Sequence, residues 1–307
     1  MSQYHQLSNG IQMPAIGFGT YPMVGQQLTD AVYHAYNAGF RLFDTADNYY
    51  NEEDLGNALK SLYNTTKAKR EELFLVTKIS DELYKPGTLG GGSNKGIYFW
   101  KNSPVMQAPD AVANIVRQKV ENSLKYLKTD YIDLLLMHWP YPDFFVGIWE
   151  EMEKLYAEGK IKAIGVCNCR ERHFEKLKKH CHIQPMVNQF ESSPVNTKVS
   201  LVNYCNENNI RVMIYSPLMN LRRPAHPRYQ EYLNVLATKY GKTISQIVLR
   251  FDVQRGLVPI PKSTKKERIE ENFNVFDFQL TEEEMNGLLN LNEDRQYMPE
   301  SRSCPGL

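Results

Sequence analysis

Ionisable side chains stand directly after several short apolar runs of this sequence. Lys78 ends one such run, and a buried ammonium is unfavourable unless a carboxylate compensates it, so Asp44, at the end of the preceding run, is its expected partner. By themselves these two residues would indicate a structural ion pair. Tyr49 changes this interpretation, because a nearby ammonium would lower the pKa of a phenol from about 10 toward the range of a general acid. His138 ends the next apolar run, where a neutral imidazole would donate a hydrogen bond to a substrate oxygen.

The elements that must position these residues follow from an alternation along the chain. Brief β-branched or aliphatic runs, expected to be strands, lie at 15–19, 41–44, 73–78, 132–138, 163–166, 186–189, 212–215 and 258–261. Segments with helical spacing of apolar residues lie at 28–38, 52–62, 110–127, 145–158, 171–179, 198–208, 245–254 and 265–274. The alternation predicts an α/β fold with a parallel sheet, and eight units in about 250 residues favour a closed (β/α)8 TIM barrel.

In such a barrel the carboxyl ends of the strands form one mouth, where catalytic residues gather. The polar or aromatic residues at the expected strand ends are Thr20, Tyr21, Asp44, Lys78, His138, Asn168, Gln189, Tyr215 and Lys262. Packing alone does not require an ionisable or amide side chain at nearly every strand end. We therefore predict a polar site at this mouth.

Three features extend the basic barrel. An Asn9-Gly10 dipeptide between two short apolar stretches predicts an N-terminal hairpin, which would close the bottom of the barrel. Extra helices are expected at 227–240, before the seventh barrel helix, and at the C-terminus. Residues 81–109 form a long insertion after the third strand. Because no linker rich in Pro, Ser or Gly divides the chain, residues 1–307 are predicted to form a single domain.

Charge and composition argue against several classes of protein. The 36 basic and 35 acidic residues of the 307-residue chain are scattered and sum to a net charge of +1, which argues against nucleic-acid and membrane-surface binding. No apolar run approaches the ~20 residues of a membrane span, and the first residues lack the features of a signal peptide. Five cysteines without framework spacing fit a reducing compartment, so a cytoplasmic protein is expected.

One group of cysteines and histidines has residue types suited to zinc. Its members are Cys169, His173, His180, Cys181 and His182. Their spacing matches no common ligand pattern, so no metal site is expected.

The sequence resembles the aldo-keto reductases through motifs in the family's order. They are Gly17-Phe-Gly-Thr20, Phe43-Asp-Thr-Ala46 with Tyr49, Thr77-Lys78, Met137-His-Trp-Pro140, Gly165-Val-Cys-Asn168, Asn188-Gln189, Tyr215-Ser-Pro-Leu218 and Ile260-Pro-Lys-Ser263, followed by Arg268, Glu271 and Asn272. The similarity runs from about residue 5 to about residue 295. The short connection after His138 and the short tail are similar to the microbial diketogluconate reductase-like, or prostaglandin F synthase-like, branch.

This resemblance implies an NADP(H)-dependent oxidoreductase that transfers a hydride to the carbonyl of an aldehyde or ketone and yields an alcohol. It implies that Tyr49 is the general acid, that Lys78 lowers the pKa of Tyr49 and that Asp44 holds Lys78. His138 would orient the carbonyl. The substrate pocket implied by the resemblance contains Tyr21, Tyr49, His138 and Trp139.

The resemblance also implies a cofactor site across the same mouth. Tyr215 would stack on the nicotinamide, while Asn168 and Gln189 would hydrogen-bond its carboxamide. Lys262 and Arg268 suit the extra phosphate of NADPH and make NADH the less suitable cofactor. The full implied set is Gly19, Thr20, Asp44, Cys167, Asn168, Gln189, Tyr215, Ser216, Leu218, Lys262, Ser263, Arg268, Glu271 and Asn272.

Two residues depart from the family pattern. Cys167 stands where the family has serine, and a thiol is a weaker hydrogen-bond donor and acceptor. Ile79 stands where a tryptophan often follows the catalytic lysine, so the substrate of a relative does not transfer directly. No Gly-x-Gly-x-x-Gly motif follows an early strand, which argues against a Rossmann dehydrogenase.

The insertion at 81–109 leaves from the catalytic mouth, and it carries Tyr98, Phe99 and Trp100. These aromatic residues suggest a specificity lid over the pocket. Its glycines favour the alternative, a mobile solvent loop.

Two other functions are compatible with such a barrel. One is an NADP(H)-binding sensor or regulatory subunit with little turnover. The other is a phosphate-binding barrel isomerase or aldolase that uses Lys78 as a Schiff-base nucleophile. The presence of all four catalytic residues favours the reductase, with a small-molecule carbonyl as its partner. The resemblance implies a monomer, which is the usual form of the family.

Overall fold

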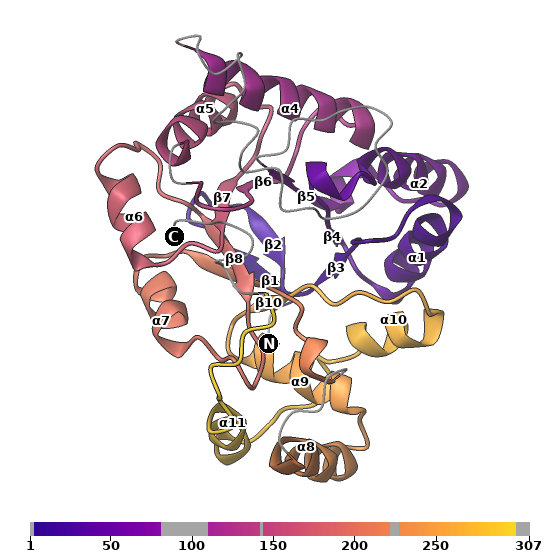
Figure 1. Cartoon of the computed structure of the whole chain (residues 1–307). Helices are drawn as coiled ribbons and strands as arrows, with labels where there is room; N and C mark the ends of the chain where they lie inside the picture. Colours follow the sequence, from indigo (N-terminus) through magenta and orange to yellow (C-terminus); the bar gives the residue numbers. More distant parts are fainter. Residues whose placement is uncertain (1–2, 81–109, 142–143, 222–226, 299–307) are drawn as a thin grey trace.

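The computed structural model describes residues 3–80, 110–141, 144–221 and 227–298. Eight parallel strands lie side by side in chain order and form the barrel (Figure 1). The strands are β3 (Gly17–Gly19), β4 (Leu42–Asp44), β5 (Phe74–Ile79), β6 (Leu134–Met137), β7 (Ile164–Cys167), β8 (Val187–Glu191), β9 (Arg211–Tyr215) and β10 (Val258–Pro259). All eight predicted strands are therefore present.

The first and last strands approach each other and nearly close the barrel. The backbone N–H of Gly19 donates to the Pro261 carbonyl at 3.1 Å. A Cβ atom on Gly19 would lie 3.1 Å from the Ile260 carbonyl oxygen, so a residue without a side chain favours this approach. Gly19 was predicted to contact the cofactor, but this close approach is by itself a structural reason for a glycine at this position.

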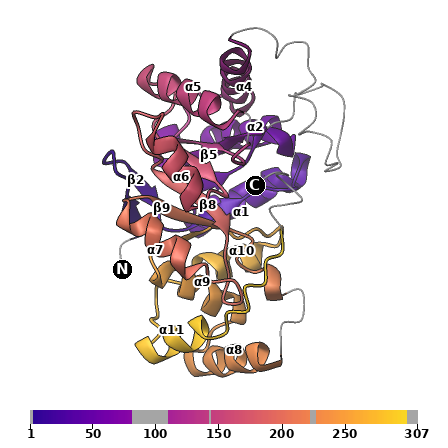
Figure 2. The ribbon, with the colours of Figure 1, turned by 60° about the vertical axis from the view of Figure 1, so that its left-hand side comes forward.

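Helices return the chain between strands and surround the barrel (Figures 1 and 2). They are α1 (Gly25–Ala38), α2 (Glu52–Thr65), α4 (Ala111–Leu127), α5 (Phe145–Ala157), α6 (Glu171–Lys178), α7 (Val199–Glu207), α9 (Ile244–Gln254) and α10 (Lys266–Phe273). Their apolar residues recur at steps of three and four, as Leu28, Ala31, Val32 and Ala35 do on α1, and this face is buried. The predicted (β/α)8 barrel is confirmed.

The N-terminal hairpin lies at the amino ends of the strands. It consists of β1 (Tyr4–Gln6) and β2 (Gln12–Pro14), which pair antiparallel. Asn9 in its turn donates to the Lys162 carbonyl just before β7, and Arg211 at the start of β9 donates to the Gln6 carbonyl. The hairpin therefore covers the end of the barrel opposite to the predicted site.

The two extra helices, α8 (Pro227–Tyr240) and α11 (Glu282–Leu289), lie next to each other at one side of the molecule (Figure 2). Leu233 of α8 and Leu288 of α11 belong to one buried apolar cluster. Lys239 and Glu284 form an ion pair of 2.6 Å between the two helices. None of the helices in the described ranges has the length and apolar character that crossing a bilayer requires.

Candidate active site

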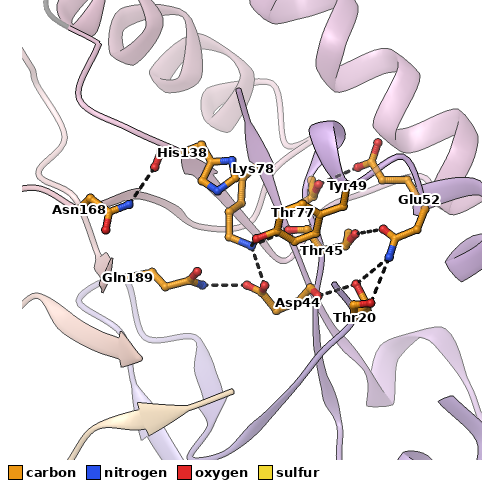
Figure 3. A network of polar contacts seen from close by, with 11 residues as sticks. Thr20, Asp44, Thr45, Tyr49, Glu52, Thr77, Lys78, His138, Asn168 and Gln189 are labelled. Atoms are coloured by element: carbon orange, nitrogen blue, oxygen red, sulfur yellow. Dashed lines mark hydrogen bonds and ion pairs between the residues drawn. The ribbon is translucent and has the colours of Figure 1, made fainter. Parts of the chain in front are cut away.

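The strands bring the four predicted catalytic residues to one mouth of the barrel (Figure 3). Asp44 is the last residue of β4, Lys78 is the penultimate residue of β5, and His138 directly follows β6. Tyr49 ends the short 3-10 helix η1 (Asp47–Tyr49), which follows β4. The sequence places these residues close together because parallel strands end at the same edge.

Lys78 is completely enclosed and paired. Its Nζ donates to Asp44 Oδ1 at 2.6 Å and to the Thr45 carbonyl at 2.7 Å, and the residue is 1% exposed. Burial opposes the charge on Lys78, but the Asp44 carboxylate, with Tyr49 and Cys167 acting in the same direction, raises the pKa of the lysine above its usual range. A Schiff-base nucleophile must be an unprotonated amine, so this environment argues against the isomerase or aldolase alternative.

The Tyr49 hydroxyl faces the ammonium of Lys78. The distance from Lys78 Nζ to Tyr49 Oη is 3.5 Å, and the ammonium lies 4.9 Å from the centre of the phenol ring. Burial raises the pKa of Tyr49 to about 12, while Lys78 acts in the opposite direction. The sequence predicted a lowered pKa and is wrong on the net shift, because packing around the ring outweighs the ammonium. The phenol therefore holds its proton at neutral pH, as a proton donor must.

His138 lies near Tyr49 on the same side as Lys78 (Figure 3), with the Tyr49 and His138 ring centres 5.8 Å apart. Burial, followed by the charges of Lys78 and Lys119, lowers the pKa of His138 well below its usual range. The imidazole is therefore neutral. Among the described residues its buried Nδ1 atom has no hydrogen-bond partner.

The amide side chains at the ends of β7 and β8 connect to the same centre. Gln189 Nε2 donates to Asp44 Oδ2 at 2.7 Å, and Asn168 Nδ2 donates to the His138 carbonyl at 3.3 Å. Tyr215 at the end of β9 donates its hydroxyl to Asn168 Oδ1 at 2.9 Å. Each amide carries two donors and an acceptor with two lone pairs, so capacity remains for a ligand.

Cys167, at the end of β7, is buried beside the charged pair. Burial raises the pKa of its thiol, with Lys78 acting in the opposite direction. The residue is 1% exposed. It is thus a neutral thiol where the resembled family has a hydroxyl.

The remaining predicted cofactor residues follow β9 and β10. Ser216 adopts a left-handed backbone conformation at φ 55°, and Leu218 is half-buried. The Ser263 hydroxyl accepts from the Lys265 N–H at 3.1 Å, just before α10. Arg268 is exposed on α10, and Lys262 is half-buried after β10. Two cations, hydroxyls, amides and an aromatic ring along one mouth fit the phosphates and carboxamide of NADP(H).

The last three predicted cofactor residues are Thr20, Glu271 and Asn272, and the first two of them have contacts within the protein. The Thr20 hydroxyl donates to the Asp44 carbonyl at 2.9 Å, and the residue is fully buried. Glu271 Oε1 accepts from the Thr243 hydroxyl at 2.5 Å, next to the start of α9. Asn272 is buried on α10. For Thr20 and Glu271 these contacts give a structural role that does not need the cofactor.

Two aromatic residues stand at the predicted substrate side. The Tyr21 ring lies 4.8 Å from the Tyr49 ring and is 55% exposed, so it can meet a ligand from solvent. Trp139 is buried in the main apolar cluster. Ile79 is also buried. The proposed lid at 81–109 lies outside the described residues.

A second polar group, which we call the outer cluster, consists of Asp47, Glu52, Thr77 and Lys119. None of these residues was assigned a role from the sequence, and only Thr77 was named, as part of the Thr77-Lys78 motif. Thr77 donates its hydroxyl to Glu52 Oε1 at 2.6 Å, and Lys119 Nζ donates to Asp47 Oδ2 at 2.7 Å. The one sequence signal for this cluster was the polar stretch that continues after Tyr49. That stretch looks like the solvated start of an ordinary helix.

Asn51 was also missed. It is fully buried, donates to the Met23 carbonyl at 2.9 Å and accepts from the Thr45 hydroxyl at 2.7 Å. It therefore joins the loop after β3 to the loop after β4.

The cysteine and histidine group is dispersed. His173 Nδ1 accepts from the Arg170 N–H at 2.9 Å at the start of α6. Over the described ranges, no three His, Cys, Asp or Glu side chains converge as metal ligands would.

Comparison with known proteins identifies the family. A sequence profile described as "Aldo/keto reductase family" matches residues 15–293. The chain belongs to the aldo/keto reductase family. The glyoxal reductase of Bacillus subtilis (strain 168) is 37% identical over 295 residues, which cover 96% of this chain and 94% of that protein. Methylglyoxal reductase DkgA of Escherichia coli (strain K12) is 35% identical over 298 residues, or 96% of this chain and 95% of that protein.

Solved structures agree with this assignment. The aldo-keto reductase of Bombyx mori in complex with NADP superimposes with a TM-score of 0.82 at 32% identity, covering 98% of this chain and 96% of that chain. The predictions of family and enzyme class are confirmed: the protein is an NADP(H)-dependent oxidoreductase of carbonyl compounds.

Proposed function

We propose that this enzyme reduces small aldehydes with NADPH, that 2-oxoaldehydes such as glyoxal and methylglyoxal are among its substrates, and that Tyr49 is the proton donor. The observation that carries the proposal is the Tyr49 hydroxyl, 3.5 Å from an ammonium that is itself 2.6 Å from a buried carboxylate. Similarity to two reductases of such aldehydes, over nearly the full length of each chain, supports the substrate class.

The residues divide the chemistry of carbonyl reduction among them. When bound, NADPH supplies the hydride that reduces the carbonyl carbon. Negative charge then develops on the carbonyl oxygen, and Tyr49 Oη gives that oxygen its proton. Lys78 stabilises the phenolate that remains, and Asp44 holds Lys78 in place. Such a positioned acid accounts for about 10²- to 10⁴-fold in rate.

His138 orients the substrate in this proposal. Its imidazole is neutral, so one ring nitrogen carries a proton that can be donated to the carbonyl oxygen while the ring adds no charge. Tyr21 and Trp139 would line the pocket beside it.

The cofactor-binding roles of the mouth residues belong to the proposal as well. Tyr215 would stack against the nicotinamide, and Asn168 and Gln189 would bind its carboxamide, with the Cys167 thiol beside them. Lys262 and Arg268 would pair with the extra phosphate, so NADPH is preferred to NADH.

A panel of aldehydes and ketones, assayed with NADPH and with NADH, tests the proposal. We expect NADPH oxidation that is fastest with the 2-oxoaldehydes, slower with NADH, and nearly absent in Tyr49→Phe. If NADPH binds tightly but no carbonyl of the panel causes its oxidation, the protein is a cofactor-binding sensor instead.

We further infer that the enzyme acts as a monomer in the cytoplasm. The family resemblance supports the monomer, and the cysteines without framework spacing support a reducing compartment such as the cytoplasm. Light scattering of the purified protein measures its mass, and a dimer would overturn the first part.

A further inference from the structure

The outer cluster lies on the opposite side of β5 from the catalytic residues. Successive side chains of a strand point to opposite faces, so Thr77 faces away from the barrel interior while Lys78 faces into it. Figure 3 shows Glu52, which accepts from Thr77, on the side of Tyr49 away from Lys78. The Tyr49 segment is therefore held between two polar groups.

Asp47 connects the Tyr49 segment to two other elements. Its carboxylate accepts from Lys119 Nζ of α4 at 2.7 Å and from the Ser80 N–H after β5 at 3.1 Å and 3.2 Å. The side chains of Lys119 and Asp47 are only 9% and 13% exposed. Asp47 thus fixes the start of η1 to the barrel wall and to a long helix at once.

The turn that carries Tyr49 is short and has few backbone hydrogen bonds of its own. It spans Asp47–Tyr49, and the Tyr49 N–H donates to the Ala46 carbonyl at 3.1 Å. The next residue, Tyr50, has a left-handed backbone at φ 55°. A single 3-10 turn has weaker hydrogen-bond geometry than an α-helix, so side-chain contacts must fix its position.

A mostly buried ion pair is a weak source of stability. Removing two charges from water costs about as much as their attraction returns, and apolar residues of similar size are often equally stable. Lys119 and Asp47 are 72 residues apart in sequence, and their contact joins α4 to the catalytic turn. Their geometry therefore points to a role in placing the turn.

The charge of Lys119 also acts on His138. It is one of the groups, after burial and Lys78, that keep this imidazole neutral. Lys119 thus acts on one of the two residues that would contact the carbonyl oxygen, and Asp47 lies two positions before the other, Tyr49.

We propose that Asp47 and Lys119 form a positioning pair that fixes the Tyr49 hydroxyl relative to Lys78 and His138 during carbonyl reduction. The proposal rests on the proposed function, in which Tyr49 is the proton donor. The pair itself does not contact substrate or cofactor. Loss of either member should let η1 move and should misplace the hydroxyl without emptying the cofactor site.

Steady-state kinetics of Asp47→Asn, Lys119→Met and the double variant test the pair, with methylglyoxal and NADPH as probes. A misplacement of about 1 Å can cost up to about 10²-fold, and we expect kcat to fall about 10-fold in each single variant. KM for methylglyoxal and Kd for NADPH should stay within about twofold, since the mouth residues are untouched. The kcat of the double variant should be no lower than the kcat of the less active single variant, because the two residues act as one unit.

Arg117→Met is the matched control. Arg117 lies on the same helix, forms an ion pair with Glu151 at 2.5 Å, and has a side chain that is 33% exposed. Its removal should leave kcat unchanged. Lys119→Gln, which keeps a hydrogen-bond donor without the charge, replaces Lys119→Met if that variant does not fold.

Three results would overturn the inference. In the first, kcat is unchanged in both single variants although Tyr49→Phe has lost turnover; the proposed function then stands and the positioning pair is wrong. In the second, the losses are additive, so that the residues act separately. In the third, kcat falls equally in Arg117→Met, and the effect is a general one of α4. Turnover retained in Tyr49→Phe would instead contradict the proposed function.

Discussion

The inner cluster of Asp44, Tyr49, Lys78 and Gln189 and the outer cluster are built from similar residue types on the two sides of one strand. In the inner cluster Lys78 and Asp44 form an ion pair of 2.6 Å, and the Lys78 ammonium faces the Tyr49 hydroxyl at the mouth. In the outer cluster an ion pair of 2.7 Å and a hydrogen bond of 2.6 Å join elements of the scaffold to one another.

The difference between the clusters teaches that residue types alone do not mark a catalytic group. Thr77 and Lys78 are neighbours in the chain, yet one binds α2 and the other faces the barrel interior. What separates them is the side of the strand on which each side chain lies. Substitutions in the inner cluster should therefore affect chemistry most, and those in the outer cluster should affect stability or positioning.

The largest effect is expected for Lys78→Met. Turnover should fall by about 10²- to 10⁴-fold, because the phenolate of Tyr49 loses its cation. The free energy of unfolding should fall by about 3–5 kcal/mol, because the Asp44 carboxylate is left buried without its partner. Stopped-flow kinetics and urea denaturation measure the two quantities.

The double variant Lys78→Met/Asp44→Asn separates the two effects. It should recover most of the stability, since no buried charge remains unpaired, but none of the turnover. Recovery of turnover would mean that the only role of Lys78 is to neutralise the buried charge of Asp44.

A pH effect on stability is expected from Glu52 in the outer cluster. Burial raises the pKa of Glu52 from 4.5 to about 7, so the folded protein binds a proton more tightly than the unfolded chain does. The resulting stabilisation is complete below pH 4.5 and is lost as pH rises through about 7. A shift of this size corresponds to about 3 kcal/mol.

Urea denaturation of the wild type and Glu52→Gln across this pH range isolates that effect. As pH rises, the free energy of unfolding of the wild type should fall relative to that of Glu52→Gln. A constant difference from pH 4.5 to pH 7 would show that Glu52 stays charged in the folded protein.

A smaller loss is expected for Thr77→Val. This substitution removes the hydroxyl that donates to Glu52 and leaves a buried oxygen without that bond, at a cost of about 1–3 kcal/mol. Thr77→Ser keeps the hydroxyl and serves as the control in thermal unfolding. A melting temperature of Thr77→Val equal to that of the wild type would show that this hydrogen bond adds no net stability.

The smallest effect is expected at the opposite end of the barrel. Asn9→Ala removes the hydrogen bond of 2.9 Å to the Lys162 carbonyl and should cost about 1 kcal/mol. Its kcat and KM should equal those of the wild type, because the hairpin lies far from the mouth. Altered kinetics would show that the two ends are coupled.

The sequence alone predicted the barrel and the inner cluster. Lys78 and Asp44 stand out because charged residues that follow apolar strands must meet at one mouth, and the alternation of strands and helices fixes which mouth that is. Tyr49 was a candidate acid from its expected closeness to Lys78, and the motif resemblance implied the same role. These predictions depend on local patterns, which a sequence contains.

The outer cluster depends on packing between distant segments. Lys119 and Asp47 are 72 positions apart, and their contact follows from the face that α4 presents to η1. The pKa of Tyr49 was mispredicted for a related reason. Proximity to Lys78 was foreseeable, but the degree of burial depends on how Tyr21 and His138 pack around the ring.

The most direct test of Tyr49 as the proton donor is a single-turnover measurement. Wild type and Tyr49→Phe are each saturated with NADPH and mixed rapidly with methylglyoxal, and the Kd for NADPH is measured in parallel. We expect the reduction step to slow by at least about 10²-fold while the Kd stays unchanged. A reduction step within about threefold of the wild-type rate would contradict the assignment of Tyr49.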